Sequence, residues 1–152
     1  MNVKATLSPQ DLARACADAM WKEDDASPGL GMEIVEIGPG RAVLTMTVQP
    51  HMVNGQRIAH GGFIFLLADS TFAFACNSHN ERAVAAQCDI TFIKPGKLGD
   101  RLTATAREIS RTGRSGIYDV RVTSGDVVIA EFRGHSRTIG GAWLRPADTE
   151  AK

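Results

Sequence analysis

The segment that most constrains the fold is a run of apolar residues near the middle of the chain, "HGGFIFLLADSTFAFACNS", at positions 60–78. If the residues from 61 to about 78 form a helix, apolar side chains lie on nearly all sides of it. Such a helix belongs in a core and not on a surface. The rest of the chain must therefore supply a surface that wraps it.

Segments of alternating apolar and polar residues on both sides of this run can supply that surface. Before it, "GMEIVEI-GPG-RAVLTMTV" has the pattern of a hairpin whose second arm carries Ala42, Leu44, Met46 and Val48 on one face. After it come "AVAAQCDITFI", "RLTATAREI", "GIYDVRV" and "VVIAEFRGHSRTI", separated by the turn sequences "KPGKLGD", "SRTGRSG" and "TSGD". We expect strands at each of these segments.

At the N-terminus, Ser8 as N-cap and Pro9 at the first helical position predict a helix over about 8–22. The predicted order is then α-ββ-α-ββββ. Without a βα alternation this order favours the α+β class and an antiparallel sheet. We expect five or six strongly curved strands around the central helix, in a single domain over residues 1–152, with a loose C-terminal tail over about 142–152.

Composition disfavours several classes of function. The 17 basic and 17 acidic residues cancel, so there is no basic field to attract nucleic acid or an anionic membrane. The apolar run is too short and too interrupted to cross a bilayer. The first residues lack the apolar core of a signal peptide, so we expect a cytoplasmic protein. The four histidines and three cysteines show no metal-ligand spacing, so we expect no metal site.

Asp69 is the unexpected residue of the apolar run, because burying an ionised carboxylate without a partner is costly. It is either a functional group, a solvated carboxylate at a helix edge or a hydrogen-bonded core residue. Gly61 and Gly62 stand where the helix should begin. Free N–H groups there can stabilise the charge on a carbonyl oxygen under attack. The plainer interpretation is that two glycines start a helix in a tight space.

Asp69 and Gly61 are too far apart on one helix to act on the same carbonyl. Asp69 follows Gly61 by eight residues, which is about 12 Å along a helix axis. An attacking group must come within about 3.5 Å of the carbonyl carbon. Two copies lying antiparallel across a twofold axis would bring each Gly61 to the other chain's Asp69. A catalytic pair therefore requires at least a dimer with shared sites, in which Asp69 is a nucleophile or a general base for water.

Polar residues nearby are candidates for supporting roles. Asn54 would orient a water or a carbonyl, or is an ordinary Asn-Gly turn residue. His60 would hydrogen-bond a backbone group and fix the loop, or is a plain polar residue at the helix entry. Arg111 and Arg114 in one turn, and Lys94 in another, would hold phosphate oxygens or are solvated turn charges.

Three stretches resemble the hotdog-fold acyl-CoA thioesterases: "NGQRIAHGGFIFLLADSTFAFACNS", "CDITFIKPGKLGD" and "FRGHSRTIGG". The similarity covers roughly residues 8–141 and is greatest to the PaaI group, the thioesterases of phenylacetic acid degradation. It implies the hotdog fold, a curved antiparallel sheet wrapped around one long helix. It also implies a homodimer with a continuous sheet, usually within a tetramer of two dimers, and hydrolysis of aryl- or arylacetyl-CoA, hydroxylated phenylacetyl-CoA above all, without metal or other cofactor.

The resemblance also implies roles for single residues. The N–H of Gly61 would form the oxyanion hole, and Asp69 of the neighbouring subunit would be the nucleophile or general base. Asn54 would help place the thioester or water, and His60 would support the loop. The residues expected to contact the acyl-CoA substrate are Gly62, Phe63, Arg111, Arg114 and Lys94.

One departure from the family leaves the route of hydrolysis open. Some relatives carry a hydroxyl residue near the start of the next strand, where this chain has Ala83-Val84-Ala85-Ala86. Either Ser70 or Thr71 substitutes, or the chain works without it. Two other functions remain: a hotdog dehydratase or hydratase, which needs a histidine paired with an acid, and a non-catalytic acyl-CoA sensor. A sensor has no reason to keep a costly acid beside the thioester.

Overall fold

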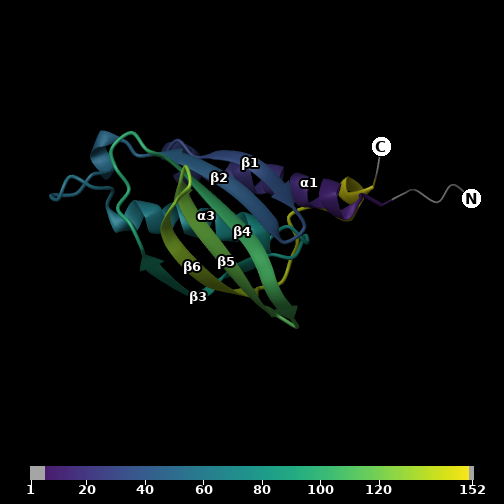
Figure 1. Ribbon diagram of the computed structural model, residues 1–152. Coiled ribbons are helices and arrows are strands. Elements are labelled where there is room, and N and C mark those ends of the chain that lie inside the picture. The colour runs from purple at the N-terminus through teal and green to yellow at the C-terminus, as the bar shows by residue number, and fades with distance from the viewer. Residues whose placement is uncertain (1–5, 151–152) are drawn as a thin grey trace, which may run out of the picture.

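A curved antiparallel sheet wraps one long helix in the computed structural model, which describes residues 6–150 (Figure 1). The strand order is β1-β2-β4-β5-β6-β3, and all neighbouring strands are antiparallel. The elements are α1 (Pro9–Glu23), α2 (Ala26–Gly29), β1 (Glu33–Gly38), β2 (Arg41–Thr47), η1 (Pro50–Met52), α3 (Gly61–Cys76), β3 (Ala83–Phe92), β4 (Arg101–Thr112), β5 (Ser115–Ser124), β6 (Val127–Thr138) and η2 (Pro146–Thr149). The predicted α+β class is confirmed.

The N-terminal helix α1 forms where its cap signals place it. Oγ of Ser8 accepts the N–H of Asp11 at 3.1 Å, and Pro9 takes the first helical position, where no N–H is needed. The helix packs on β1 through its buried Ala13 and Ala17. The predicted helix over about 8–22 is confirmed.

The central helix α3 is a core helix, as its composition predicted. Ile64, Leu67 and Phe72 are buried against the inner face of the sheet. Gly134 of β6 allows the closest approach, because a Cβ at Gly134 would lie 2.8 Å from the ring of Phe72. A strand glycine of this kind marks a place where two elements pack with no room for a side chain.

One stripe of α3 is left without full cover by the sheet. Its residues are spaced by three or four positions and so share one side of the helix. They are Gly62, Phe65, Leu66, Asp69 and Ala73. Strand β3 contacts α3 and is an edge of the sheet, since only β6 pairs with it within residues 6–150. Most of β3 is exposed, including Val84 at 47% and Phe92 at 52%.

The hairpin between β4 and β5 is longer than the sequence predicted. The segment "SRTGRSG" was expected to be a turn, but Arg111 pairs with Gly116 and Thr112 with Ser115 in the sheet. Only residues 113–114 form the turn. Arg111 therefore lies in a strand and not in a turn, because backbone pairing extends past the last apolar residue of β4.

The C-terminal segment, predicted to be loose over about 142–152, makes specific contacts as far as residue 150. Nε1 of Trp143 donates to Oδ1 of Asn77 at 2.8 Å, and the guanidinium of Arg82 lies 4.2 Å from the centre of the Trp143 ring. Residues 151–152 lie outside the described residues. Across residues 6–150, no helix combines the length and the apolar character that crossing a membrane requires.

Candidate active site

The loop between η1 and α3 is shaped by the side chain of Asn54. Its Oδ1 accepts two backbone N–H groups, from Gln56 at 3.0 Å and from Ile58 at 3.3 Å. The backbone N–H of Asn54 donates to the carbonyl of Ile58 at 2.9 Å. Nδ2 of Asn54 has no hydrogen-bond partner within residues 6–150. Asn54 is therefore a turn residue, as one interpretation held, and still has a free donor.

His60 caps the first turn of α3 and decides which N–H there remains available. Nδ1 of His60 accepts the N–H of Gly62 at 2.9 Å, and the carbonyl of His60 accepts the N–H of Phe63 at 3.0 Å. The N–H of Gly61 has no acceptor among the described residues. Of the two glycines, Gly61 alone presents an unbonded donor with the positive end of the helix dipole behind it.

Gly61 opens on a cavity with an apolar wall. The phenyl ring of Phe92 lies over it, 2.8 Å from the position that a Cβ on Gly61 would take. The residues lining this cavity come from the η1–α3 loop, the start of α3, the last residue of β3 and the segment after it: Asn54, Ile58, Ala59, Gly61, Ile64, Phe92, Ile93, Lys94 and Pro95. The fold thus brings together Asn54, Gly61 and Lys94 of the predicted site, and adds Phe92.

Asp69 is not in this cavity, as the helix rise requires, but lies two turns along α3 on the uncovered stripe. Its carboxylate has no hydrogen bond or ion pair within the described chain, and burial raises its pKa. Burial and then the charge of Asp69 raise the pKa of Cys88, on β3, to about 11. The acid therefore stands beside the exposed edge strand, without a partner from its own chain.

Neither hydroxyl next to Asp69 replaces the one missing from the following strand. Oγ1 of Thr71 donates to the carbonyl of Leu67 at 2.7 Å inside the core. Oγ of Ser70 pairs with Oγ of Ser27 at 2.9 Å. Both hydroxyls are hydrogen-bonded to other groups and not to the carboxylate, so within one chain no hydroxyl next to Asp69 is available to assist it.

The two predicted arginines do not join the Gly61 cavity of the same chain. Arg111 and Arg114 line a small cavity with Cys76, the last residue of α3. The guanidinium of Arg114 donates to the carbonyl of Thr138 at 2.9 Å. The 16 residues of α3 separate these arginines from Gly61, which corresponds to about 24 Å of helix.

Phe63 does not line the cavity. Its ring contacts His51 and His60 edge-on, with centroid distances of 6.0 and 6.3 Å. Gly62 is exposed, but its N–H is already bonded to His60. Within one chain, neither residue offers a free polar group to a ligand of the cavity.

One histidine–acid pair is present that sequence reasoning missed, since its members are 29 positions apart. Nε2 of His79 lies 2.8 Å from Oε2 of Glu108, and the hydroxyl of Tyr118 donates to the same oxygen at 2.8 Å. Burial alone would raise the pKa of Glu108, but these hydrogen bonds outweigh it and lower that pKa. The pair stands beyond the C-terminal end of α3 and away from Gly61, so it does not form the dehydratase arrangement. No cluster of three potential metal ligands occurs in residues 6–150.

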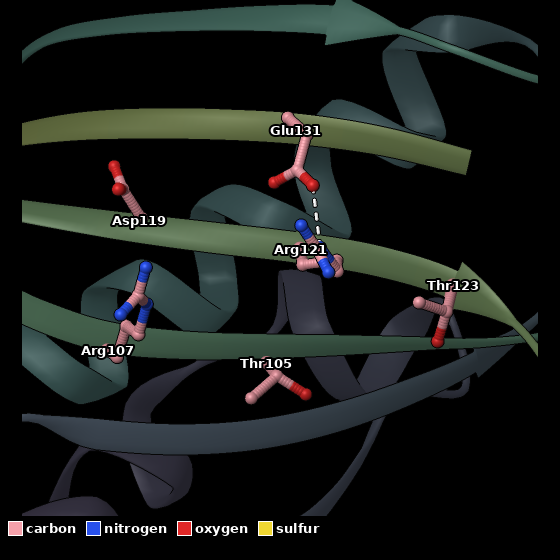
Figure 2. Close-up of a pocket in the computed structure, with 6 residues that line it drawn as sticks. All are labelled: Thr105, Arg107, Asp119, Arg121, Thr123 and Glu131. Carbon is pink, nitrogen blue, oxygen red and sulfur yellow. Dashed lines mark hydrogen bonds and ion pairs between the residues drawn. The ribbon is translucent and has the colours of Figure 1, made fainter. Parts of the chain in front are cut away.

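The outer face of the sheet carries a shallow pocket of a different character (Figure 2). Arg121 pairs with Glu131 at 2.6 Å across β5 and β6, and Asp119 pairs with Arg133 at 2.6 Å. Such cross-strand ion pairs are usual on a solvated sheet face. Because its carboxylates Asp119 and Glu131 are engaged in these ion pairs, we do not assign this face to catalysis.

Comparison with known proteins agrees with the fold. A family model described as the thioesterase superfamily matches residues 56–131. Acyl-coenzyme A thioesterase PaaI of Escherichia coli (strain K12) is 44% identical over 126 residues, which is 82% of this chain and 90% of that protein. The solved structure of E. coli PaaI, from the phenylacetic acid degradation operon, matches with a TM-score of 0.87 and 43% identity, covering 89% of this chain and 99% of that chain.

A Streptococcus mutans UA159 protein solved with bound acetyl CoA matches with a TM-score of 0.70 and 28% identity, over 73% of this chain and 90% of that chain. The six-stranded sheet around α3 is the hotdog fold of these relatives. By sequence and by fold, the chain belongs to the thioesterase superfamily.

Proposed function

We propose that this protein is an acyl-CoA thioesterase of the PaaI type, which hydrolyses aryl- or arylacetyl-CoA thioesters, hydroxylated phenylacetyl-CoA among them, to the free acid and coenzyme A. The observation that carries the proposal is the unbonded N–H of Gly61 at the start of α3, facing an apolar cavity. A donor held at a helix N-terminus suits the oxyanion that forms when a thioester carbonyl is attacked. The kinship with E. coli PaaI supports the reaction and its setting in phenylacetate degradation.

The active site is completed by a second copy of the chain. Asp69 stands about 12 Å from Gly61 along α3, too far for both to act on one carbonyl. The uncovered stripe of α3 and the exposed edge of β3 are contiguous. A second chain that pairs its β3 with this edge lays its own α3 antiparallel to the first. Each Gly61 then faces Asp69 of the partner subunit, and a homodimer holds two shared sites. The family resemblance extends this dimer to a tetramer of two dimers.

In the completed site the thioester carbonyl oxygen accepts the N–H of Gly61, and the free Nδ2 of Asn54 is the second donor in reach. Asp69 of the partner subunit then acts by one of two routes. As a nucleophile it displaces the coenzyme A thiolate and forms a mixed anhydride, which water hydrolyses. As a general base it takes a proton from the attacking water, and the thiolate leaves with a proton as the tetrahedral adduct collapses. Both routes place the developing charge on the same oxygen.

The side chains of the cavity wall suit an apolar acyl group. Ile58, Ile64 and Phe92 line the space next to Gly61, and the half-exposed Phe92 ring presents an aromatic face to a ligand. Lys94 lines the same cavity and suits an anionic part of the substrate. Arg111 and Arg114 of the same chain lie a helix length away. In an antiparallel pair, those of the other chain are the nearer ones.

The test is release of free thiol from a panel of coenzyme A thioesters: phenylacetyl, hydroxyphenylacetyl, benzoyl and straight-chain acyl. We expect turnover by the wild type, and a loss of at least about a hundredfold in Asp69→Asn. Asp18→Asn is the matched control, because Asp18 is an exposed aspartate of α1 and belongs neither to the cavity lining nor to β3. Full activity of Asp69→Asn would remove Asp69 from the mechanism. A wild type that binds coenzyme A but hydrolyses nothing on the panel would point to a sensor.

A further inference from the structure

Arg57 adopts a backbone conformation that its own side chain does not explain. Within residues 6–150, only Arg57 and Asn80 are non-glycine residues with positive φ, at 64° and 59°. This left-handed region costs an L-residue on the order of 1 kcal/mol relative to glycine. Asn80 has a compensation, because its Oδ1 accepts the N–H of Trp143 at 3.1 Å and of Leu144 at 2.9 Å. The guanidinium of Arg57 has no hydrogen bond, ion pair or ring contact in the described chain.

The loop holds Arg57 in this conformation through Asn54. The N–H of Arg57 donates to the carbonyl of Asn54 at 3.0 Å. Oδ1 of Asn54 accepts the N–H groups on both sides of it, from Gln56 and from Ile58. The backbone at Arg57 is thus fixed at the tip of a tight loop, and this loop projects from one end of the molecule (Figure 1).

The position of this loop relates Arg57 to the cavity of Gly61. Asn54 and Ile58, on either side of Arg57, both line that cavity, and so does Lys94. Neither Lys94 nor Arg57 has an ion-pair partner within residues 6–150. Five other arginines of the described chain do have an acid partner, for example Arg41, which pairs with Glu36 at 2.7 Å. Lys94 lines the cavity and Arg57 belongs to the loop that borders it, so the two unneutralised cations favour an anionic ligand there.

We propose that Arg57, together with Lys94, binds a phosphate group of the coenzyme A part of the substrate. This inference rests on the proposed function. If the thioester carbonyl lies at Gly61 and the acyl group against the apolar wall, the phosphate-bearing end of the substrate leaves through the opening between the loop and Lys94. A guanidinium fork matches two phosphate oxygens at once. Substrate binding then explains why an arginine stands where glycine would be unstrained.

The test compares three variants on two thioesters of the same acyl group, one of coenzyme A and one of pantetheine, which lacks the phosphates. Arg57→Gly should raise KM for the coenzyme A thioester about tenfold, with kcat unchanged and the melting temperature equal or higher, because glycine adopts positive φ freely. KM for the pantetheine thioester should not change. Arg57→Lys should have a KM for the coenzyme A thioester between those of the wild type and Arg57→Gly. Arg14→Ala, an exposed arginine of α1, is the control that leaves both values unchanged.

Two results would overturn the proposal. An equal rise of KM for both thioesters would mean that Arg57 shapes the loop and does not bind phosphate. An unchanged KM for the coenzyme A thioester would exclude any role in binding. If the wild type hydrolyses neither thioester, the proposed function fails separately. Calorimetric titration with free coenzyme A and with pantetheine then tests the role of Arg57. Arg57→Gly should bind coenzyme A about tenfold more weakly than the wild type does, while its Kd for pantetheine is unchanged.

Discussion

The phenyl ring of Phe92 covers Gly61 so closely that a Cβ on Gly61 would lie 2.8 Å from its Cζ. The same glycine carries the N–H that no acceptor in residues 6–150 uses. Gly61 therefore has two separable properties, a lack of side chain that admits the ring and a free donor that faces the cavity. Two substitutions distinguish them.

Gly61→Pro removes the N–H, whereas Gly61→Ala keeps it and adds the same Cβ. Gly61 is the first residue of α3, where proline is tolerated, and His60 before it has φ −63° and ψ 131°, which proline allows. Both variants displace the half-exposed ring of Phe92. We expect kcat of Gly61→Pro to be at least about a hundredfold below that of Gly61→Ala. Equal kcat values in the two variants, with both folded by circular dichroism, would exclude the donor role.

Mixing two inactive variants tests whether the active site is shared between chains. In a dimer of one Gly61→Pro chain and one Asp69→Asn chain, one site carries both substitutions and the other carries neither. Random mixing makes half of the dimers mixed, and half of their sites intact, so we expect about a quarter of wild-type activity. The two variants are unfolded together and refolded, and thiol release is measured against each refolded alone. No recovery, with mixed dimers demonstrated by mass spectrometry, would place both groups in one chain's site.

The cap of α3 should matter for both stability and turnover, and α1 offers the control. His60→Ala removes the acceptor of the Gly62 N–H and should lower the free energy of unfolding by about 1 kcal/mol. We also expect kcat to fall, because the loop beside Gly61 loses the hydrogen bond that fixes it to the start of α3. Ser8→Ala removes the equivalent bond on α1 and should lower stability similarly without changing kcat. Denaturant unfolding and thiol release measure the two effects. A matching fall of kcat in Ser8→Ala would show that turnover follows stability alone.

The Glu108 cluster should make stability depend on pH in the acid range. Burial opposes ionisation of Glu108, but the hydrogen bonds from His79 and Tyr118 prevail and keep its pKa below the ordinary 4.5. The folded chain therefore binds this proton less tightly than the unfolded chain does. The resulting stability is present above pH 4.5 and is lost as pH falls through the lower, folded-state pKa. We expect Glu108→Gln to lower the melting temperature at neutral pH, and the difference from wild type to shrink on acidification. A difference independent of pH would assign the effect to packing.

Much of the fold was predictable because the pattern of α3 leaves few alternatives. A helix that is apolar on nearly all sides must be surrounded by other elements. The alternation of apolar and polar residues in β2 through β6 predicted the strands that surround it. The sequence did not predict α2, which is one short turn of Ala26–Gly29. The predicted β4 also ended too early. Arg111 and Thr112 pair with β5 through backbone groups only, so no apolar alternation marks them as strand residues.

The candidate site was predicted in part, and the errors of the prediction concern the distances between residues. Asn54, His60 and Gly61 belong to one loop and helix start, so their spacing in the chain fixed their proximity. Lys94 precedes β4 and Arg111 lies near the end of β4, a strand of 12 residues that spans about 40 Å. The predicted order of antiparallel strands was therefore sufficient to place Lys94 and Arg111 at opposite ends of the strands. The positive φ of Arg57 could not be predicted, because the loop contains Gly55, the residue that adopts a positive φ most readily, and nothing in "NGQRIAH" marks position 57.

The described chain closes on itself at the end opposite the η1–α3 loop. The N–H of Leu7 donates to the carbonyl of Thr149 at 2.9 Å, and Thr6 pairs with Glu150 as an antiparallel bridge. Both ends of the described chain, residues 6 and 150, lie on the α1 side of the molecule, opposite that loop (Figure 1). A tag attached to either end of the described chain would therefore lie away from the Gly61 opening of its own chain and, in the antiparallel dimer proposed above, on the side of the partner subunit's opening.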